Sequence, residues 1–208
     1  MHKNVFTPEN AALLLIDHQI GTMSWTRSHD VEEIKKNAVL LAKVATATGL
    51  PLVFTSSMEE RAQGPLLTEL EEAAPEAFAN RVKRAGIVNA MHDPNFNNAV
   101  KATGREKVFV AGISTEICVV FPVLQLLDEG YEVQVVTDAS ASSTKLGNDA
   151  ALRRLEQAGA VITSTPQVVS GLAVDWTTPK GQALSKLLNP GVQVKQWEKK
   201  EKTSLLMG

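Results

Sequence analysis

The sequence has one cysteine, Cys118, among 208 residues, and only four histidines. A single cysteine cannot form an internal disulfide, which favours a reducing compartment. The histidines His2, His18, His29 and His92 lack the spacing of three or four residues that is typical of zinc motifs. We therefore expect neither a disulfide nor a metal site.

The sequence also lacks a strong excess of charge and a long apolar run. Its 21 basic and 23 acidic residues give a formal net charge of −2, which leaves no broad positive surface for a nucleic acid. No apolar run could cross a bilayer, and the start, MHKNVFTPEN, lacks the apolar stretch of a secretory signal. The motifs GxGxxG and GxxxxGKS/T are missing, so we expect no nucleotide cofactor. These absences predict a cytoplasmic protein without nucleic-acid or membrane partners.

What the sequence does contain is an alternation of short apolar runs and helical patterns. Helical spacing at residues 31–49, with Asp30 and Gly49 as start and stop signals, is the clearest example. The pattern predicts an α/β protein with a three-layer, Rossmann-like fold, in which helices flank both faces of a six-stranded, mainly parallel sheet. The six expected strands lie within residues 11–17, 50–57, 80–90, 106–113, 131–140 and 160–164.

The chain shows no linker or change of composition that would divide it, which predicts a single domain over residues 1–208. We expect the core of this domain to span about residues 8–165. A loop at residues 64–75 interrupts the alternation and is expected to hold a short helix. Residues 166–208 end in a charged stretch without clear periodicity, so we expect this segment to form an interface or to be partly flexible.

Cys118 lies in the stretch AGISTEICVVF, directly after a predicted strand. Ligands of a parallel α/β sheet bind at the carboxyl ends of the strands, where this stretch belongs. If Thr115 caps the next helix, Cys118 lies in its first turn, where free N–H groups and the helix dipole favour a thiolate and can hold an oxyanion. The alternative is a cysteine that fills space in the core, which is common.

Two further charged side chains follow predicted strands. Asp17 ends the run LLLI, where its carboxylate could accept a thiol proton and later return it to a leaving amine. Asp17 could instead form a turn or cap the next loop. Arg84 would supply a permanent positive charge, although a surface salt bridge is the more usual role of an arginine.

Four blocks of the sequence together resemble a known family. The segments LLLIDHQ, RAGIVNA, AGISTEICV and VVTDAS follow the order found in the isochorismatase-like hydrolases, also called cysteine hydrolases, over residues 11–164. The pattern RxGxxNA with TEICVVFP is most similar to the YcaC-like branch, whose substrates are poorly defined. The motif around the cysteine is fairly specific, whereas each other block is weak alone.

The resemblance implies a catalytic triad of Asp, Lys and Cys, which Asp17 and Cys118 match directly. The middle position departs from the common lysine, because it holds Arg84; Lys83 is the alternative if the register slips by one residue. Side chains alternate along a strand, so only one of the two can reach the site, and we choose Arg84.

The resemblance also implies a cis peptide between Ile113 and Ser114. Such a bond would aim the Ser114 amide at the oxyanion site, beside the amide of Cys118. Zinc-binding relatives, the nicotinamidases, carry AspxHis and a further histidine after the second strand, where this chain has TSSMEERAQG. The resemblance therefore implies no metal.

Several other side chains near the strand ends are candidates. Gln19 is expected to contact substrate or to hold its own loop. His18 is expected at a rim or an interface rather than as a base, and Asp138 as a turn former or helix cap. The candidates for the oxyanion hole and substrate binding are Ile113, Ser114, Thr115, Gln19, Glu59 and Asn89, with Phe96 as a further possible pocket residue.

Together these residues predict a cofactor-independent hydrolase of a small molecule. Cys118 would attack an amide-type carbon, Asp17 would act as general base, and Arg84 would replace the usual lysine. The alternative is a catalytically weak or inactive relative that serves as an oligomeric scaffold or thiol sensor. The resemblance to the YcaC-like branch also implies a homo-oligomer, with an octameric ring as the candidate assembly.

Overall fold

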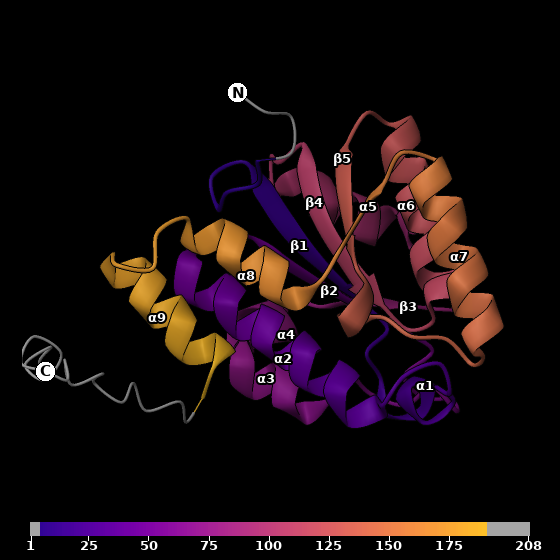
Figure 1. Ribbon diagram of the computed structural model, residues 1–208. Coiled ribbons are helices and arrows are strands. Elements are labelled where there is room, and N and C mark those ends of the chain that lie inside the picture. Colours follow the sequence, from indigo (N-terminus) through magenta and orange to yellow (C-terminus); the bar gives the residue numbers. More distant parts are fainter. Residues whose placement is uncertain (1–4, 191–208) are drawn as a thin grey trace, which may run out of the picture.

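The computed structural model describes residues 5–190 of the chain (Figure 1). Its six strands form one sheet in the order β3-β2-β1-β4-β5-β6, and all five neighbouring pairs are parallel. The predicted α/β fold with a six-stranded sheet is therefore confirmed. The strands are β1 (Ala11–Ile16), β2 (Leu52–Ser57), β3 (Val82–Arg84), β4 (Lys107–Gly112), β5 (Glu132–Val136) and β6 (Val161–Thr163).

Strand β1 lies at the centre of the sheet and is buried along its whole length. Its side chains alternate between two hydrophobic cores: Leu13 and Leu15 belong to one, and Leu14 and Ile16 to the other. This explains why the strand is a continuous apolar run, since helices cover both of its faces. Ile16, its last residue, pairs with β2 and with β4, so the ends of the three strands meet.

Helices α2, α3, α4, α8 and α9 contribute to the core on one face of the sheet (Figure 1). The longest, α2, begins where the Asp30 carboxylate accepts hydrogen bonds from Glu32 and Glu33, and ends at Gly49, whose φ of 70° is left-handed. Both ends match the sequence prediction. The helices on this side are α1 (Ile20–Ser24), α2 (Val31–Thr48), α3 (Thr68–Ala73), α4 (Pro75–Ala79), α8 (Thr165–Ala173) and α9 (Pro179–Leu188).

Helices α5 (Pro94–Ala102), α6 (Val120–Asp128) and α7 (Lys145–Gln157) cover the opposite face. A five-residue π-helical turn, Thr115–Val119, joins β4 to α6 and carries Cys118. Short 3-10 turns at Ala90–His92 and Thr137–Ala139 complete the described elements. Within residues 5–190, no helix is long and apolar enough to span a membrane.

Helices α8 and α9 were not expected from the sequence. Val169 and Leu172 of α8 and Leu184 of α9 are buried in the same core as α2. The Asp138 carboxylate anchors the start of α8, because its Oδ1 accepts hydrogen bonds from the Thr165 amide (2.7 Å) and hydroxyl (2.8 Å). Residues 166–188 are therefore part of the packed domain, and the tail expected to form an interface lies, from residue 191 on, outside the described residues.

Candidate active site

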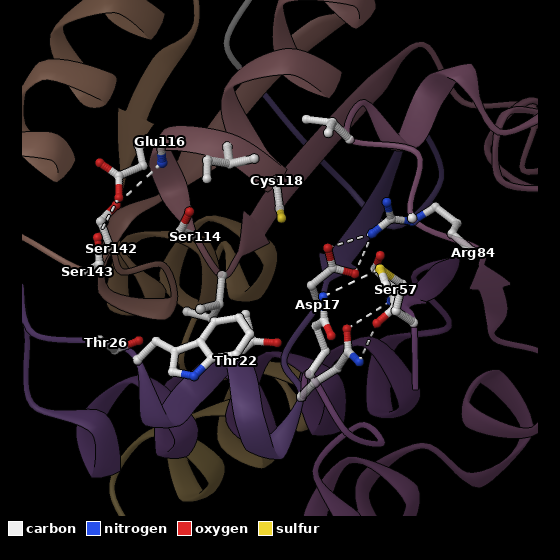
Figure 2. Close-up of a pocket in the computed structure, with 18 of the residues that line it drawn as sticks. Asp17, Thr22, Thr26, Ser57, Arg84, Ser114, Glu116, Cys118, Ser142 and Ser143 are labelled. Carbon is white, nitrogen blue, oxygen red and sulfur yellow. Dashed lines mark hydrogen bonds and ion pairs between the residues drawn. The ribbon is translucent and has the colours of Figure 1, made fainter. Parts of the chain in front are cut away.

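A cavity of about 330 Å³ lies at the carboxyl edge of the sheet (Figure 2). Its wall includes Asp17 after β1, Ser57 at the end of β2, Arg84 at the end of β3, and Ile113 and Ser114 after β4. Parallel strands place their carboxyl ends at one edge, so residues far apart in sequence meet there. The cavity therefore lies at the carboxyl ends of the strands, where the sequence predicted a ligand site.

Asp17 and Arg84 form an almost completely buried ion pair, with exposed side-chain fractions of 2% and 1%. The Nη2 group of Arg84 donates to both carboxylate oxygens of Asp17. Asp17 has a φ of 58°, so the chain turns sharply as soon as β1 ends. Burial raises the pKa of Asp17, although the charge and hydrogen bonds of Arg84 oppose the shift. The carboxylate is thus a better proton acceptor than an exposed one.

Besides its ion pair with Asp17, Arg84 donates two further hydrogen bonds. Its Nε donates to Thr55 Oγ1 (3.0 Å) and its Nη1 to the Ile87 carbonyl (2.6 Å). Lys83, the neighbouring alternative, points away: its side chain is 57% exposed and its Nζ lies 3.0 Å from Glu59. Alternation along β3 therefore brings Arg84, and not Lys83, to Asp17. Its catalytic role stays a prediction.

Cys118 projects from the π-helical turn, and its sulfur points into the cavity toward Asp17 (Figure 2). The thiol and the Asp17 carboxylate interact electrostatically. Burial raises the pKa of the Cys118 thiol, and the negative charge of Asp17 raises it further; a main-chain hydrogen bond from Ser114 and the charge of Arg84 only partly oppose this. The expectation that the helix start favours a thiolate is wrong, because burial and Asp17 outweigh it.

The turn before Cys118 departs in one respect from the sequence prediction. Thr115 does not cap the helix. Ser114 holds the cap position, and Thr115 is fully buried, with no hydrogen-bond partner for its hydroxyl among residues 5–190. The peptide between Ile113 and Ser114 is cis, as the resemblance implied. Ile113 and Ser114 line the cavity, whereas Thr115 does not. That these residues form an oxyanion hole stays a prediction.

Gln19 holds its own loop, which was one of the two expected roles. Its Nε2 donates to the carbonyls of Ser57 (2.9 Å) and Gly64, and its Oε1 accepts from the Ser57 amide (2.8 Å). Gln19 is fully buried but forms part of the cavity wall. It therefore joins β2 and the following loop to the end of β1 and shapes the wall.

Glu59, expected to line the pocket, points elsewhere. Its carboxylate binds the guanidinium of Arg81 (2.8 Å), the hydroxyl of Ser56 (2.7 Å) and the ammonium of Lys83 (3.0 Å). Burial alone would raise the pKa of Glu59, but these partners lower it to about 2. The expectation was wrong because this cluster of opposite charges lies beside the cavity and draws the side chain away from it.

The expected positions of Asn89, Phe96 and His18 are also wrong. Asn89 is the N-cap of the turn Ala90–His92 and donates to Gln125, and Phe96 is completely buried in the core, so neither lines the cavity. His18 is not at a rim: it is fully buried, and its Nε2 lies 2.8 Å from the Ala139 carbonyl. Burial lowers the pKa of His18 to about 4, which keeps the ring neutral near pH 7.

The cavity also contains side chains that the sequence analysis missed. They come from α1, the residues directly after it, the π-helical turn that carries Cys118, and the segment before α7. Only the packing of these segments brings them to the cavity. The missed lining residues include Thr22, Trp25, Thr26, Glu116, Ser142 and Ser143. Within residues 5–190, no group of three or more His, Cys, Asp or Glu side chains could hold a metal ion.

Comparison with known proteins assigns a family to this architecture. Residues 11–167 match the Isochorismatase domain family. The Escherichia coli (strain K12) protein named "Probable hydrolase YcaC" is 39% identical over 167 residues, which is 80% of this chain and 79% of the relative.

Solved structures agree with the sequence match. YcaC from Pseudomonas aeruginosa, solved with hexane-2,5-diol and covalent acrylamide, superimposes with a TM-score of 0.84 at 37% identity, over 90% of this chain and 92% of that one. The YcaC gene product of Escherichia coli, described as an octameric hydrolase of unknown specificity, gives the same TM-score at 35% identity and the same coverage.

Proposed function

This chain belongs to the isochorismatase family, and we propose that it is a cofactor-independent hydrolase that cleaves an amide-type C–N bond of a small molecule. One observation carries the proposal: the Cys118 thiol faces the Asp17 carboxylate in a cavity, and Arg84 holds that carboxylate from its other side. A nucleophile, an adjacent base and a group that orients the base are what nucleophilic catalysis requires.

The first half of the reaction forms a thioester. Asp17 accepts the thiol proton as the sulfur of Cys118 attacks the amide carbon, and the main-chain N–H groups of Ser114 and Cys118 receive the oxyanion. When the C–N bond breaks, Asp17 returns the proton to the departing amine. Proton transfer and attack occur together, because the raised thiol pKa leaves little thiolate in the resting enzyme.

The second half releases the acid. Asp17 removes a proton from a water molecule, which attacks the thioester carbon and expels the Cys118 sulfur; the sulfur recovers the proton and a carboxylic acid leaves. Arg84 takes no part in these proton transfers. In place of the usual lysine it acts as a fixed counter-charge that orients Asp17.

Reaction with amides and alkylating agents tests this function. Because the chain has one cysteine, mass spectrometry of the intact protein reports Cys118 alone. Acrylamide, bound covalently in the Pseudomonas aeruginosa relative, should add once to the wild type and not at all to Cys118→Ala. A screen of small amides and esters should find turnover in the wild type only. Turnover that survives in Cys118→Ala would overturn the proposal.

A second candidate is a weak or inactive relative that serves as a scaffold or thiol sensor. Two observations favour the inactive scaffold over a thiol sensor or an enzyme: the raised pKa of the thiol, which leaves little reactive thiolate, and an arginine in place of the usual lysine. The same screen separates the two candidates. Alkylation of Cys118 without hydrolysis of any tested amide or ester would favour this second function.

The protein is further proposed to be a homo-oligomer, with the octamer of the Escherichia coli relative as the candidate assembly. Trp25, Val88 and Ile117 support a contact, because all three line the cavity yet stay 47%, 55% and 46% exposed. Light scattering after size exclusion should give about eight times the 22.4 kDa chain mass. A monomer at micromolar concentration would contradict this.

A further inference from the structure

Two hydroxyl groups in the cavity wall lack partners. Thr22 and Thr26 are 8% and 3% exposed, and neither Oγ1 has a hydrogen-bond partner within the described chain. A buried hydroxyl without a partner costs stability, so such groups are uncommon in folded proteins. Both residues line the cavity, and Figure 2 shows Thr26 on the side away from Arg84, with Thr22 between Thr26 and Asp17.

The cavity wall also contains a carboxylate, Glu116. Glu116 accepts a hydrogen bond from Ser143 (3.0 Å), and its main-chain N–H donates to Ser142 Oγ (3.4 Å). Its second carboxylate oxygen lies against Gly147, where an added Cβ would come within 1.8 Å of it. The missing side chain of Gly147 therefore leaves the space that this carboxylate occupies. Figure 2 shows Glu116, Ser142 and Ser143 clustered away from Arg84.

The charges of the cavity wall do not balance. Arg84 is the sole cation among its described lining residues, and each of its three nitrogens donates to a protein acceptor, including Asp17. Glu116 has no cation within salt-bridge distance in the described chain. A substrate carboxylate would thus find no free positive partner and would meet the charge of Glu116.

The cavity wall also includes large apolar side chains. Trp25, Ile113 and Ile117 are among its lining residues. Such a wall accommodates a hydrocarbon chain or ring, while few polar groups determine how it is oriented. The cavity therefore suits a molecule with a polar group at each end and an apolar body.

We propose that Thr22, Thr26 and Glu116 form a subsite for a distal hydroxyl or ammonium group of the amide substrate, and that this subsite rejects substrates with a distal carboxylate. The inference rests on the proposed function, because the scissile amide is placed at Cys118. Threonine hydroxyls can both donate and accept hydrogen bonds, so they can pair with a hydroxyl, and Glu116 can pair with an ammonium group.

Binding to Cys118→Ala tests the subsite without any chemistry. The probes are linear primary amides in a series of chain lengths, each ending in a methyl, hydroxyl, amino or carboxylate group. Calorimetry should give, at the best chain length, about tenfold tighter binding for the hydroxyl and amino probes than for the methyl probe, with the carboxylate probe weakest. Equal or tighter binding of the carboxylate probe would overturn the proposal.

Isosteric variants assign the effect to the two hydroxyls. Thr22→Val and Thr26→Val, in the Cys118→Ala background, should abolish the advantage of the hydroxyl probe over the methyl probe and leave methyl-probe affinity unchanged. They should also raise the melting temperature of the unliganded protein, because each removes an unpartnered buried hydroxyl. Thr46→Val is the matched control and should change no affinity, because the Thr46 hydroxyl in α2 donates to the carbonyls of Ala42 in α2 and Ala73 in α3.

The outcomes separate this inference from the proposed function. If amides bind with the expected order but the wild type hydrolyses none, the subsite stands and the hydrolase fails. If amides are hydrolysed but the hydroxyl advantage survives in both valine variants, the hydrolase stands and the subsite is wrong. Glu116→Gln should lower the affinity for the amino probe about tenfold and leave the affinity for the hydroxyl probe unchanged. An unchanged affinity for the amino probe would contradict the role of Glu116.

Discussion

The guanidinium of Arg84, at the end of β3, forms an ion pair with the carboxylate of Asp17, which follows β1. The two residues are 67 positions apart in the sequence. Thr55, on the strand between them, accepts a hydrogen bond from Arg84 Nε (3.0 Å). Three strands therefore fix one ion pair, and the side of the carboxylate away from Arg84 is left to the thiol of Cys118.

Asp17→Asn should make Cys118 more reactive toward iodoacetamide while it abolishes hydrolysis. Removal of the carboxylate charge leaves Arg84 unopposed, so the pKa of the thiol falls and more thiolate exists at neutral pH. We expect alkylation at pH 7 to accelerate at least about tenfold, since one pKa unit is tenfold in thiolate, and hydrolysis to fall by about 10²-fold or more. Alkylation rates from mass spectrometry across pH check this. Parallel losses of alkylation and hydrolysis would contradict it.

Arg84→Met should destabilise the fold strongly, because it leaves Asp17 buried without its partner. Breaking a buried pair in this way costs about 3–5 kcal/mol in the free energy of unfolding. Arg84→Lys keeps the positive charge beside Asp17 but loses the guanidinium hydrogen bonds to Thr55 and Ile87. It should therefore lower the free energy of unfolding by less than Arg84→Met does. Urea unfolding measures both variants. Adding Asp17→Asn to Arg84→Met should recover part of the loss; an unchanged loss would mean that the pair itself is not responsible.

Acid should destabilise the protein through His18. Its pKa of about 4 lies below the ordinary value of 6.5, so the unfolded chain binds more protons between these values. The contribution of His18 is therefore complete above pH 6.5 and is lost as the pH falls through 4, by about 3 kcal/mol in total. Urea unfolding between pH 7 and pH 4 should show a shallower decline for His18→Gln than for the wild type. Identical slopes would rule out His18 as the cause.

Glu59→Gln should lower stability and leave the active site intact. The variant loses ionic hydrogen bonds to Arg81 and Lys83, worth about 1–3 kcal/mol in the free energy of unfolding. The pKa of Glu59 is about 2, so its contribution is present above the ordinary pKa and is lost as the pH falls toward 2. Alkylation of Cys118 should match the wild type, with Glu60→Gln as the surface control. Slower alkylation of Cys118 in Glu59→Gln, but not in Glu60→Gln, would show that Glu59 does influence the active site.

The sequence by itself determined the architecture and the position of the candidate nucleophile and base. Short apolar runs alternating with helical patterns require a parallel sheet covered on both faces, and that sheet brings Asp17 and the turn of Cys118 to one edge. The two-residue period of β3 also separated Arg84 from Lys83, because alternation is a local property of any strand.

Only the tertiary structure decided the state of the thiol and the far wall of the cavity. The pKa of Cys118 depends on burial and on the nearby charge of Asp17, and no local pattern reports either. Likewise, Glu59 and Asn89 turn away toward partners, whereas Thr22, Thr26 and Glu116 reach the cavity. The state of the thiol and the far wall share one physical reason. Loop direction and burial depend on packing between distant segments, whereas the periods of strands and helices depend on residues close together in the sequence.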